Sequence, residues 1–199
     1  MLALLLAPLA VIWFGSLGMR SLISPDEGRY ASIAWEMMRS GDWITPRLNG
    51  LLYFEKPPMQ YWLSALFLHL FGLNEFAARL WPALAGFLTV LAVGATASRL
   101  WGRETGIRTL AIAASMTWVF GNAHFLTLDA GLTLFLTIAL CAVLIAENVP
   151  ATPAVRRNWI WLAWAAMAGA VLSKGLVGIL IPGATLVLTC LWRRDFGPW

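Results

Sequence analysis

The sequence predicts an all-α, polytopic membrane protein, and three observations support this: composition, the length of its apolar runs and the placement of its charges. Of the 199 residues, 60% are hydrophobic and 12% are charged, and the mean hydropathy is +0.73. A soluble globular domain carries roughly a quarter charged residues. This chain is therefore too apolar to be solvated on every side, and long apolar runs satisfy their backbone in lipid as helices.

The apolar runs follow one another along the whole chain, at 2–19, 59–71, 80–98, 107–126, 130–146, 159–172 and 176–192. A membrane helix needs about twenty residues, with a lower limit near 17. The run 59–71 is therefore too short to span, and it predicts an interfacial or re-entrant helix. Residues 173–175 (Ser-Lys-Gly) divide the last two runs and predict a tight turn. About six spanning helices result, with amphipathic surface helices in the first loop.

Basic residues predict the orientation of these helices. If the first helix runs from inside to outside, the arginines of the later loops lie inside: Arg99, Arg103, Arg108, Arg156, Arg157, Arg193 and Arg194. The short outside turns then hold only Asp129 and Lys174 as formal charges, which is the positive-inside pattern. We therefore expect the long first loop, residues 20–79, on the extracytoplasmic face. Residues 147–158 are predicted to form a plain cytoplasmic loop.

Charge and cysteine usage exclude other classes of protein. The net charge of +4 is modest, and no basic cluster with interleaved aromatic residues indicates nucleic acid as a partner. Cys141 and Cys190 lie inside apolar runs and predict no disulfide framework. Residues 1–19 lack a positively charged n-region and a small-residue cleavage site, so we expect the first helix to be retained.

The stretch 24–58 is the only long charged interval of the sequence. Residues 24–27 (Ser-Pro-Asp-Glu) have the form of a capping box, in which Ser24 caps a helix and Glu27 reaches back to it. Pro25 suits the first helical position. Gly41 is expected to end this amphipathic surface helix, whose apolar residues recur at helical spacing: Tyr30, Ile33, Ala34 and Met37.

Five polar residues share the predicted outer face and are candidates for chemistry: Asp26, Glu55, Lys56, Asp129 and Lys174. Each also has a structural explanation, since acids favour helix N-termini and lysines extend to the membrane surface. If Glu27 serves the cap, however, Asp26 is free to face a pocket. Pro57 and Pro58 bar a regular helix through Lys56, and a fixed lysine suits a phosphate. Together these residues favour chemistry on a lipid-linked phosphate.

Four motifs in fixed order carry a family resemblance: SPDEGRYA at 24–31, GDWITPR at 41–47, YFEKPP at 53–58 and FAARL at 76–80. They resemble the aminoarabinose lipid A transferases. These belong with the protein O-mannosyltransferases among the membrane glycosyltransferases of the GT-C type. Each motif alone is weak, but the combination in this order is specific.

The resemblance implies an enzyme of the bacterial inner membrane that uses a polyprenyl-phosphate sugar as donor. The sugar would be transferred on the periplasmic side, with inversion, to lipid A, another glycolipid or a protein hydroxyl. It implies catalytic or acceptor-orienting roles for Asp26 and Asp129, and a divalent cation, if one is used, at Glu55. The residues expected near the donor phosphate are Lys56, Arg29, Tyr30, Tyr53 and Lys174.

Members of that family run to several hundred residues, with further helices and a soluble periplasmic domain. The resemblance therefore predicts that residues 1–199 form the N-terminal part of a GT-C domain. The alternative is a non-catalytic membrane protein that binds or moves polyprenyl lipids. Such a protein would not need Asp26 beside the phosphate. A transporter would also show inverted repeats and broken helices, which the sequence does not indicate.

Overall fold

The computed structural model describes residues 2–150 and 152–194, and helices dominate this part of the chain. A short antiparallel hairpin, in which Arg47 pairs with Leu52, interrupts them. In chain order the elements are α1 (Leu2–Gly15), α2 (Asp26–Ser40), β1 (Arg47–Leu48), β2 (Leu51–Leu52), α3 (Met59–Phe71), α4 (Glu75–Trp101), α5 (Arg103–Ser115), α6 (Thr117–Ala123), α7 (Asp129–Asn148), α8 (Pro153–Lys174) and α9 (Val177–Arg193).

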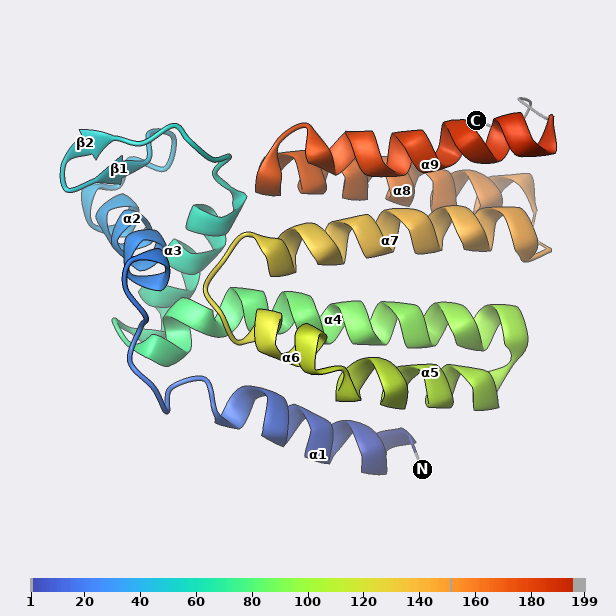
Figure 1. The fold of residues 1–199 in the computed structure, drawn as a ribbon, viewed down its shortest axis with the longest axis horizontal. Helices are drawn as coiled ribbons and strands as arrows, with labels where there is room; N and C mark the ends of the chain where they lie inside the picture. The colour runs from blue at the N-terminus through green and yellow to red at the C-terminus, as the bar shows by residue number, and fades with distance from the viewer. Residues whose placement is uncertain (1, 151, 195–199) are drawn as a thin grey trace.

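The long helices lie side by side, and α2, α3 and the hairpin gather at one end of them (Figure 1). The 27 residues of α4 give it a length of about 40 Å. In the described part of the chain, α4 and α7 are the helices both long and apolar enough to cross a membrane, and α9 is a shorter apolar helix. This arrangement agrees with the predicted all-α fold with surface helices in the first loop.

Small residues and one tryptophan hold the long helices together. The Trp13 indole of α1 donates a hydrogen bond of 2.9 Å to the Ala83 carbonyl of α4. A Cβ atom on Gly106 of α5 would press on Ser98 of α4, and one on Gly178 of α9 would overlap the backbone of Ala170 in α8. Such close backbone approach is typical of helix pairs in membranes.

The predicted apolar face of α2 is confirmed, because Tyr30, Ile33, Ala34 and Met37 are all buried. They form one core with Tyr53, which follows β2, and with residues of α3, α4 and the segment before α7: Tyr61, Ala65, Leu68, Ala77, Ala78, Leu126 and Leu128. The helix ends at Gly41, as predicted, with a φ of +72°. This core places the first loop firmly against the end of the bundle.

The predicted capping box is wrong. Helix α2 begins at Asp26 with Pro25 as N-cap, and no side chain caps it. Glu27 instead accepts a hydrogen bond of 2.9 Å from the backbone N–H of Ile23 and turns into the protein core. The reason is tertiary, because Arg79, 52 residues away in α4, binds its carboxylate together with Arg20.

The apolar run 107–126 is not one helix. Helix α5 ends at Ser115, Met116 is extended with a ψ of 115°, and α6 begins at Thr117. The break brings Ala123 of α6 directly against Gly86 of α4.

The loop predicted at 147–158 is also much shorter, because α7 continues to Asn148 and α8 begins at Pro153. The Thr152 hydroxyl caps α8 by accepting a hydrogen bond from the N–H of Val155. Proline fits the first helical turn that follows such a cap.

The predicted tight turn between the last two helices is present. Gly175 has a φ of +76°, a conformation that favours glycine. Its N–H donates to the Val171 carbonyl at 2.7 Å. The turn places Lys174 at the same end of the bundle as α2, α3 and the start of α7 (Figure 1). The turn between α4 and α5 and the connection between α7 and α8 lie at the opposite end.

Candidate functional site

The predicted site residues come from separate parts of the sequence and meet at the end of the bundle that carries α2 and α3 (Figure 1). They form three groups. One group stands at the start of α2, one lies in the extended segment before α3, and one joins the start of α7 to the end of α8.

The first group is Asp26, Arg29 and Tyr30. The Arg29 guanidinium donates a hydrogen bond of 2.7 Å to the Asp26 carboxylate and lies 5.2 Å from the centre of the Tyr30 ring. Asp26 stays 56% exposed, so it can meet a ligand. Burial raises the pKa of the Tyr30 phenol, Arg29 lowers it, and Asp26 and Asp129 raise it further. Tyr30 thus lies within electrostatic range of both predicted acids.

The second group is Tyr53, Glu55 and Lys56. The Tyr53 hydroxyl donates a hydrogen bond of 3.0 Å to the Glu55 carboxylate. Burial and this hydrogen bond raise the pKa of Tyr53. Glu55 and Lys56 line a groove of about 470 Å³ together with Lys174. Two lysines from distant parts of the sequence therefore line one hollow, and a lysine ammonium is a suitable point charge for a phosphate.

The third group is the ion pair between Asp129 and Lys174. Asp129 opens α7 and Lys174 closes α8, so the pair joins the two helices at the site. The sequence predicted that both residues lie on one face of the membrane, but it did not predict that they contact each other. Because Lys174 also lines the groove, Asp129 is linked to the place where Lys56 lies.

A divalent cation at Glu55 stays a prediction. Glu55 offers one carboxylate, which already accepts the Tyr53 hydrogen bond. Within the described residues, no three His, Cys, Asp or Glu side chains gather closely enough to hold a metal ion. These side chains do not by themselves fit a metal site around Glu55.

Sequence reasoning missed the residues that hold the site in place. Glu27 is fully buried, and Arg79 of α4 is 1% exposed. The Arg79 Nε and Nη2 atoms donate hydrogen bonds of 2.8 and 2.9 Å to the Glu27 carboxylate. Arg20 donates a further one of 2.6 Å. Burial by itself raises the pKa of Glu27. The hydrogen bonds from Arg79, Arg20 and two backbone N–H groups outweigh it and lower the pKa to about 2.

This buried pair connects four segments. Arg79 also donates to the carbonyl groups of Leu17, Arg20 and Ser21, which follow α1. Glu27 accepts a hydrogen bond of 3.0 Å from the N–H of Leu126, just before α7. The pair of Glu27 and Arg79 thereby positions the segments that carry the neighbouring Asp26 and the nearby Asp129. Arg79 falls in the FAARL motif, and a lone arginine beside an apolar run is itself a signal of function.

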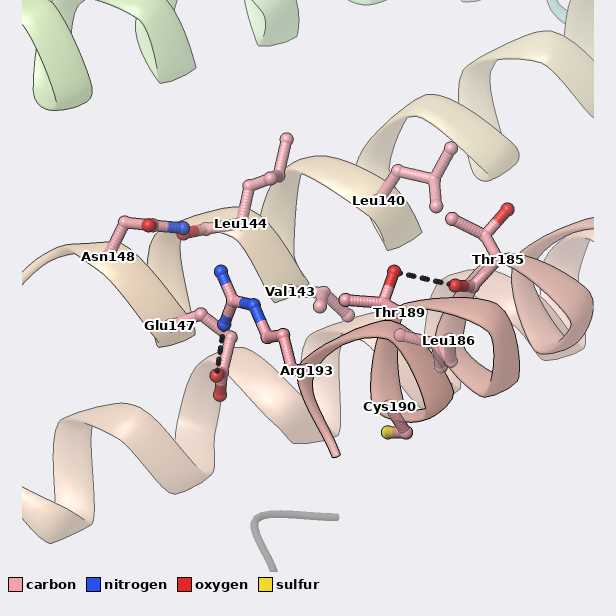
Figure 2. A pocket seen from close by; sticks show the side chains of 10 residues that line it. All are labelled: Leu140, Val143, Leu144, Glu147, Asn148, Thr185, Leu186, Thr189, Cys190 and Arg193. Atoms are coloured by element: carbon pink, nitrogen blue, oxygen red, sulfur yellow. Dashed lines mark hydrogen bonds and ion pairs between the residues drawn. The ribbon is translucent and has the colours of Figure 1, made fainter. Parts of the chain in front are cut away.

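A second hollow lies at the far end of the bundle, between α7 and α9 (Figure 2). Its volume is about 220 Å³. Leucine, valine and threonine side chains line most of it, and its charged residues Glu147 and Arg193 pair with each other at 3.5 Å. It holds none of the predicted site residues, so the groove beside Lys56 is the better candidate site.

Comparison with known proteins places the chain in a family. A family model described as dolichyl-phosphate-mannose-protein mannosyltransferase matches residues 1–196. The chain belongs to this mannosyltransferase family. Two members are named undecaprenyl phosphate-alpha-4-amino-4-deoxy-L-arabinose arabinosyl transferase. The protein of Erwinia tasmaniensis is 32% identical over 188 residues, which are 94% of this chain and 34% of the relative. That of Shewanella sediminis is 38% identical over 183 residues, covering 90% and 33%.

Two solved structures of this mannosyltransferase family have the same fold as this chain. The crystal structure of ArnT from Cupriavidus metallidurans in the apo state matches with a TM-score of 0.95 and 43% identity, over 98% of this chain and 36% of that one. The same protein bound to undecaprenyl phosphate matches with a TM-score of 0.92 and 45% identity, over the same shares. This likeness confirms the predicted fold class, a polytopic all-α membrane protein of the GT-C type. The chain spans about a third of the length of the curated relatives that it matches.

Proposed function

We propose that this chain forms the catalytic first loop and part of the donor site of a glycosyltransferase. The donor is a sugar carried on a polyprenyl phosphate. The names of the relatives favour undecaprenyl-phosphate aminoarabinose as this donor, with lipid A as the first acceptor to test and another glycolipid or a protein hydroxyl as further acceptors. One observation carries the proposal: an exposed acid, a pair of lysines and a tyrosine cluster meet at one end of the bundle.

The proposed reaction is a single displacement at the anomeric carbon of the sugar. A bond forms from the acceptor oxygen to this carbon, and the bond from the carbon to the phosphate oxygen breaks. The polyprenyl phosphate leaves with the electron pair. Asp26 accepts the proton of the acceptor or orients it, which requires a carboxylate within hydrogen-bond reach. Its exposure beside Arg29 supports this role.

Cations stabilise the leaving group in this proposal. Lys56 and Lys174 line the groove, and Arg29 lies next to Asp26 at 2.7 Å. Positive groups aimed at the charge that develops on the phosphate stabilise the transition state. Tyr30 and Tyr53 would stand beside the phosphate as neutral donors, since burial raises both of their pKa values.

The proposed location is the bacterial inner membrane, with the site facing the periplasm. The basic residues support this orientation. Arg99 and Arg103 flank the turn between α4 and α5, and Arg156 begins α8, all at the end opposite to the site. Positive residues of short loops stay in the cytoplasm.

Two substitutions test the function. In the whole protein that contains this chain, Asp26→Asn and Lys56→Ala should each reduce sugar transfer by about 100-fold or more, because each removes a group that acts in the transition state. Transfer of labelled aminoarabinose from undecaprenyl phosphate to lipid A, measured in proteoliposomes, provides the readout.

Arg108→Ala is the matched control, since it removes an exposed charge at the other end of the bundle and should leave the rate unchanged. Normal transfer by both site variants would refute the assignment. Donor binding without turnover in the wild type would favour the non-catalytic lipid-binding alternative.

A further inference from the structure

Unsatisfied polar atoms are concentrated at the proposed site. In the described part of the chain, four buried side-chain atoms have no hydrogen-bond partner: Arg29 Nε, Gln60 Oε1, Tyr61 OH and Thr127 Oγ1. An unsatisfied buried polar atom costs free energy, so folded proteins keep few of them. All four belong to α2, to the first turn of α3 or to the segment before α7, which are the segments that surround the site.

Tyr61 is the most deeply placed residue of this set. The sequence has three tyrosines, and they pack together in one core. The Tyr61 ring lies 6.1 Å from the Tyr30 ring and 6.4 Å from the Tyr53 ring, between ring centres. Its side chain is fully buried. Tyr30 and Tyr53 were predicted from the motifs, whereas no sequence pattern indicated a role for Tyr61.

The Tyr61 phenol remains protonated at neutral pH. Burial is the main cause that raises its pKa, the neighbouring Tyr53 and Tyr30 raise it further, and the Arg29 guanidinium acts in the opposite direction. Tyr61 therefore offers an O–H donor, and the Arg29 guanidinium lies 5.2 Å from the centre of the neighbouring Tyr30 ring. Arg29 Nε is a second donor without an acceptor. Two free donors near a positive charge suit an anionic oxygen.

A chain of contacts leads from the groove to Tyr61. Glu55 lines the groove beside Lys56. The Glu55 carboxylate accepts the Tyr53 hydrogen bond, and the Tyr53 ring packs edge-on against Tyr61. Tyr53 thus contacts both Glu55, which lines the groove, and the ring of Tyr61.

We infer that Tyr61 is a binding residue for the lipid donor, and that its hydroxyl, together with Arg29 Nε, donates a hydrogen bond to a phosphate oxygen. The inference rests on the proposed function and adds a residue to the same site. In the free protein the Tyr61 hydroxyl has no hydrogen-bond partner among the described residues. It gains one when the phosphate enters and the hydrogen bond between Tyr53 and Glu55 opens.

Tyr61→Phe tests this, because it removes the hydroxyl and keeps the ring. With the whole protein in detergent, the affinity for undecaprenyl phosphate should fall by about 10-fold or more, since a hydrogen bond to a charged group is lost. Binding of undecaprenol, which has the chain but no phosphate, should not change. The Tm of the ligand-free variant should stay the same or rise, because an unsatisfied buried group has been removed.

Thr89→Val is the matched control. It removes a buried hydroxyl of α4 that already bonds the Ala85 carbonyl, so it should leave lipid affinity unchanged. A Tyr61→Phe variant that binds undecaprenyl phosphate within about twofold of the wild type overturns the inference. A clear fall in its ligand-free Tm also overturns it, because the hydroxyl would then have a structural partner such as water.

The failure of this inference can be told from the failure of the proposed function by Lys56→Ala. If the wild type binds undecaprenyl phosphate and Lys56→Ala weakens that binding while Tyr61→Phe does not, only the role of Tyr61 is wrong. If the wild type does not bind the phosphate, or if Lys56→Ala binds it normally, the donor site itself is wrong.

Discussion

Asp26 and Glu27 are neighbours in the first turn of α2, and the fold gives them opposite environments. Asp26 is 56% exposed and pairs with Arg29 one turn along the helix. Glu27 is fully buried and binds Arg79, which is 52 residues away. Both acids satisfy the same local preference for a helix N-terminus. Arg79 and Arg20 distinguish them, because they bind Glu27 in the core and leave Asp26 exposed.

Glu27 makes stability depend on acid pH. Its pKa falls from 4.5 to about 2 on folding, so its contribution is complete above about pH 4.5 and is lost as the pH falls toward 2. Glu27→Gln should therefore destabilise the protein by about 3–5 kcal/mol at pH 7, where it leaves Arg79 buried without its partner charge. The difference in Tm between wild type and variant, measured in detergent, should shrink at pH 3.

Other carboxylates also titrate in this range, and the comparison with the variant removes their contribution. Glu104→Gln is the control, because Glu104 is an exposed acid on the opposite side of the bundle. It should leave the Tm unchanged at both pH values. An equal difference between wild type and Glu27→Gln at pH 3 and pH 7 would show that the charge of Glu27 does not stabilise the fold.

At the scale of the element, apolar periodicity and the positions of glycine and proline predicted the helices whose bounds depend on local sequence. The buried face of α2 and its end at Gly41 agree with the sequence prediction. The length of α3 and the turn at Gly175 do as well. The break at Met116 was not predicted, because no proline or glycine marks it and the apolar run continues through it. The break accompanies the packing of α6 on α4. This packing depends on residues of α4 that lie outside the run 107–126.

Gly178 should be essential for the packing of α9 on α8. A Cβ atom there would overlap the backbone of Ala170, which cannot move as a side chain can. Gly178→Ala should therefore lower stability by about 1–3 kcal/mol through overpacking. The Tm of the detergent-solubilised protein measures this effect.

Gly183 lies in the same helix and provides the matched control. A Cβ atom on Gly183 would meet no atom within 4 Å. Gly183→Ala should be neutral or slightly stabilising, because alanine is the better helix former. Equal Tm values for the two variants would show that the close approach of α8 and α9 does not matter for stability.

At the scale of the whole molecule, the bundle has two chemically different ends. One end carries the acids, the two lysines and the tyrosines of the site, together with Arg20, Arg29 and Arg79, which bind Glu27 or Asp26. The other carries arginines, of which Arg156 pairs with Glu147 at 2.6 Å and Arg99 lies 4.9 Å from the centre of the Trp159 ring. This separation along the long axis gives the proposed orientation in the membrane a direct test.

Single cysteines introduced at the two ends should react from opposite sides of the membrane. With Cys141 and Cys190 replaced, Ser40→Cys should be labelled by an impermeant maleimide in intact spheroplasts, because Ser40 is exposed at the end of α2. Thr105→Cys, exposed near the start of α5, should be labelled only after the membrane is permeabilised. The reverse pattern would place the site in the cytoplasm and contradict the proposed location.

Sequence alone determined the class of fold, the surface position of the first loop and the motifs that carry the family resemblance. These depend on composition, on runs of apolar residues and on short motifs, which can be identified without knowing which distant residues are in contact. The predicted site residues were also found this way, because Asp26, Lys56 and their neighbours stand in such motifs. Their meeting at one end of the bundle was expected only from their shared side of the membrane.

The tertiary structure alone decided which of these residues touch and what holds them. It paired Asp129 with Lys174 across 45 residues, placed Glu27 on Arg79 and left the Tyr61 hydroxyl without a partner. The physical reason is that burial and charge pairing depend on groups brought together from distant segments. The local sequence of a helix N-terminus or of an apolar run does not predict which distant arginine or tyrosine will contact it.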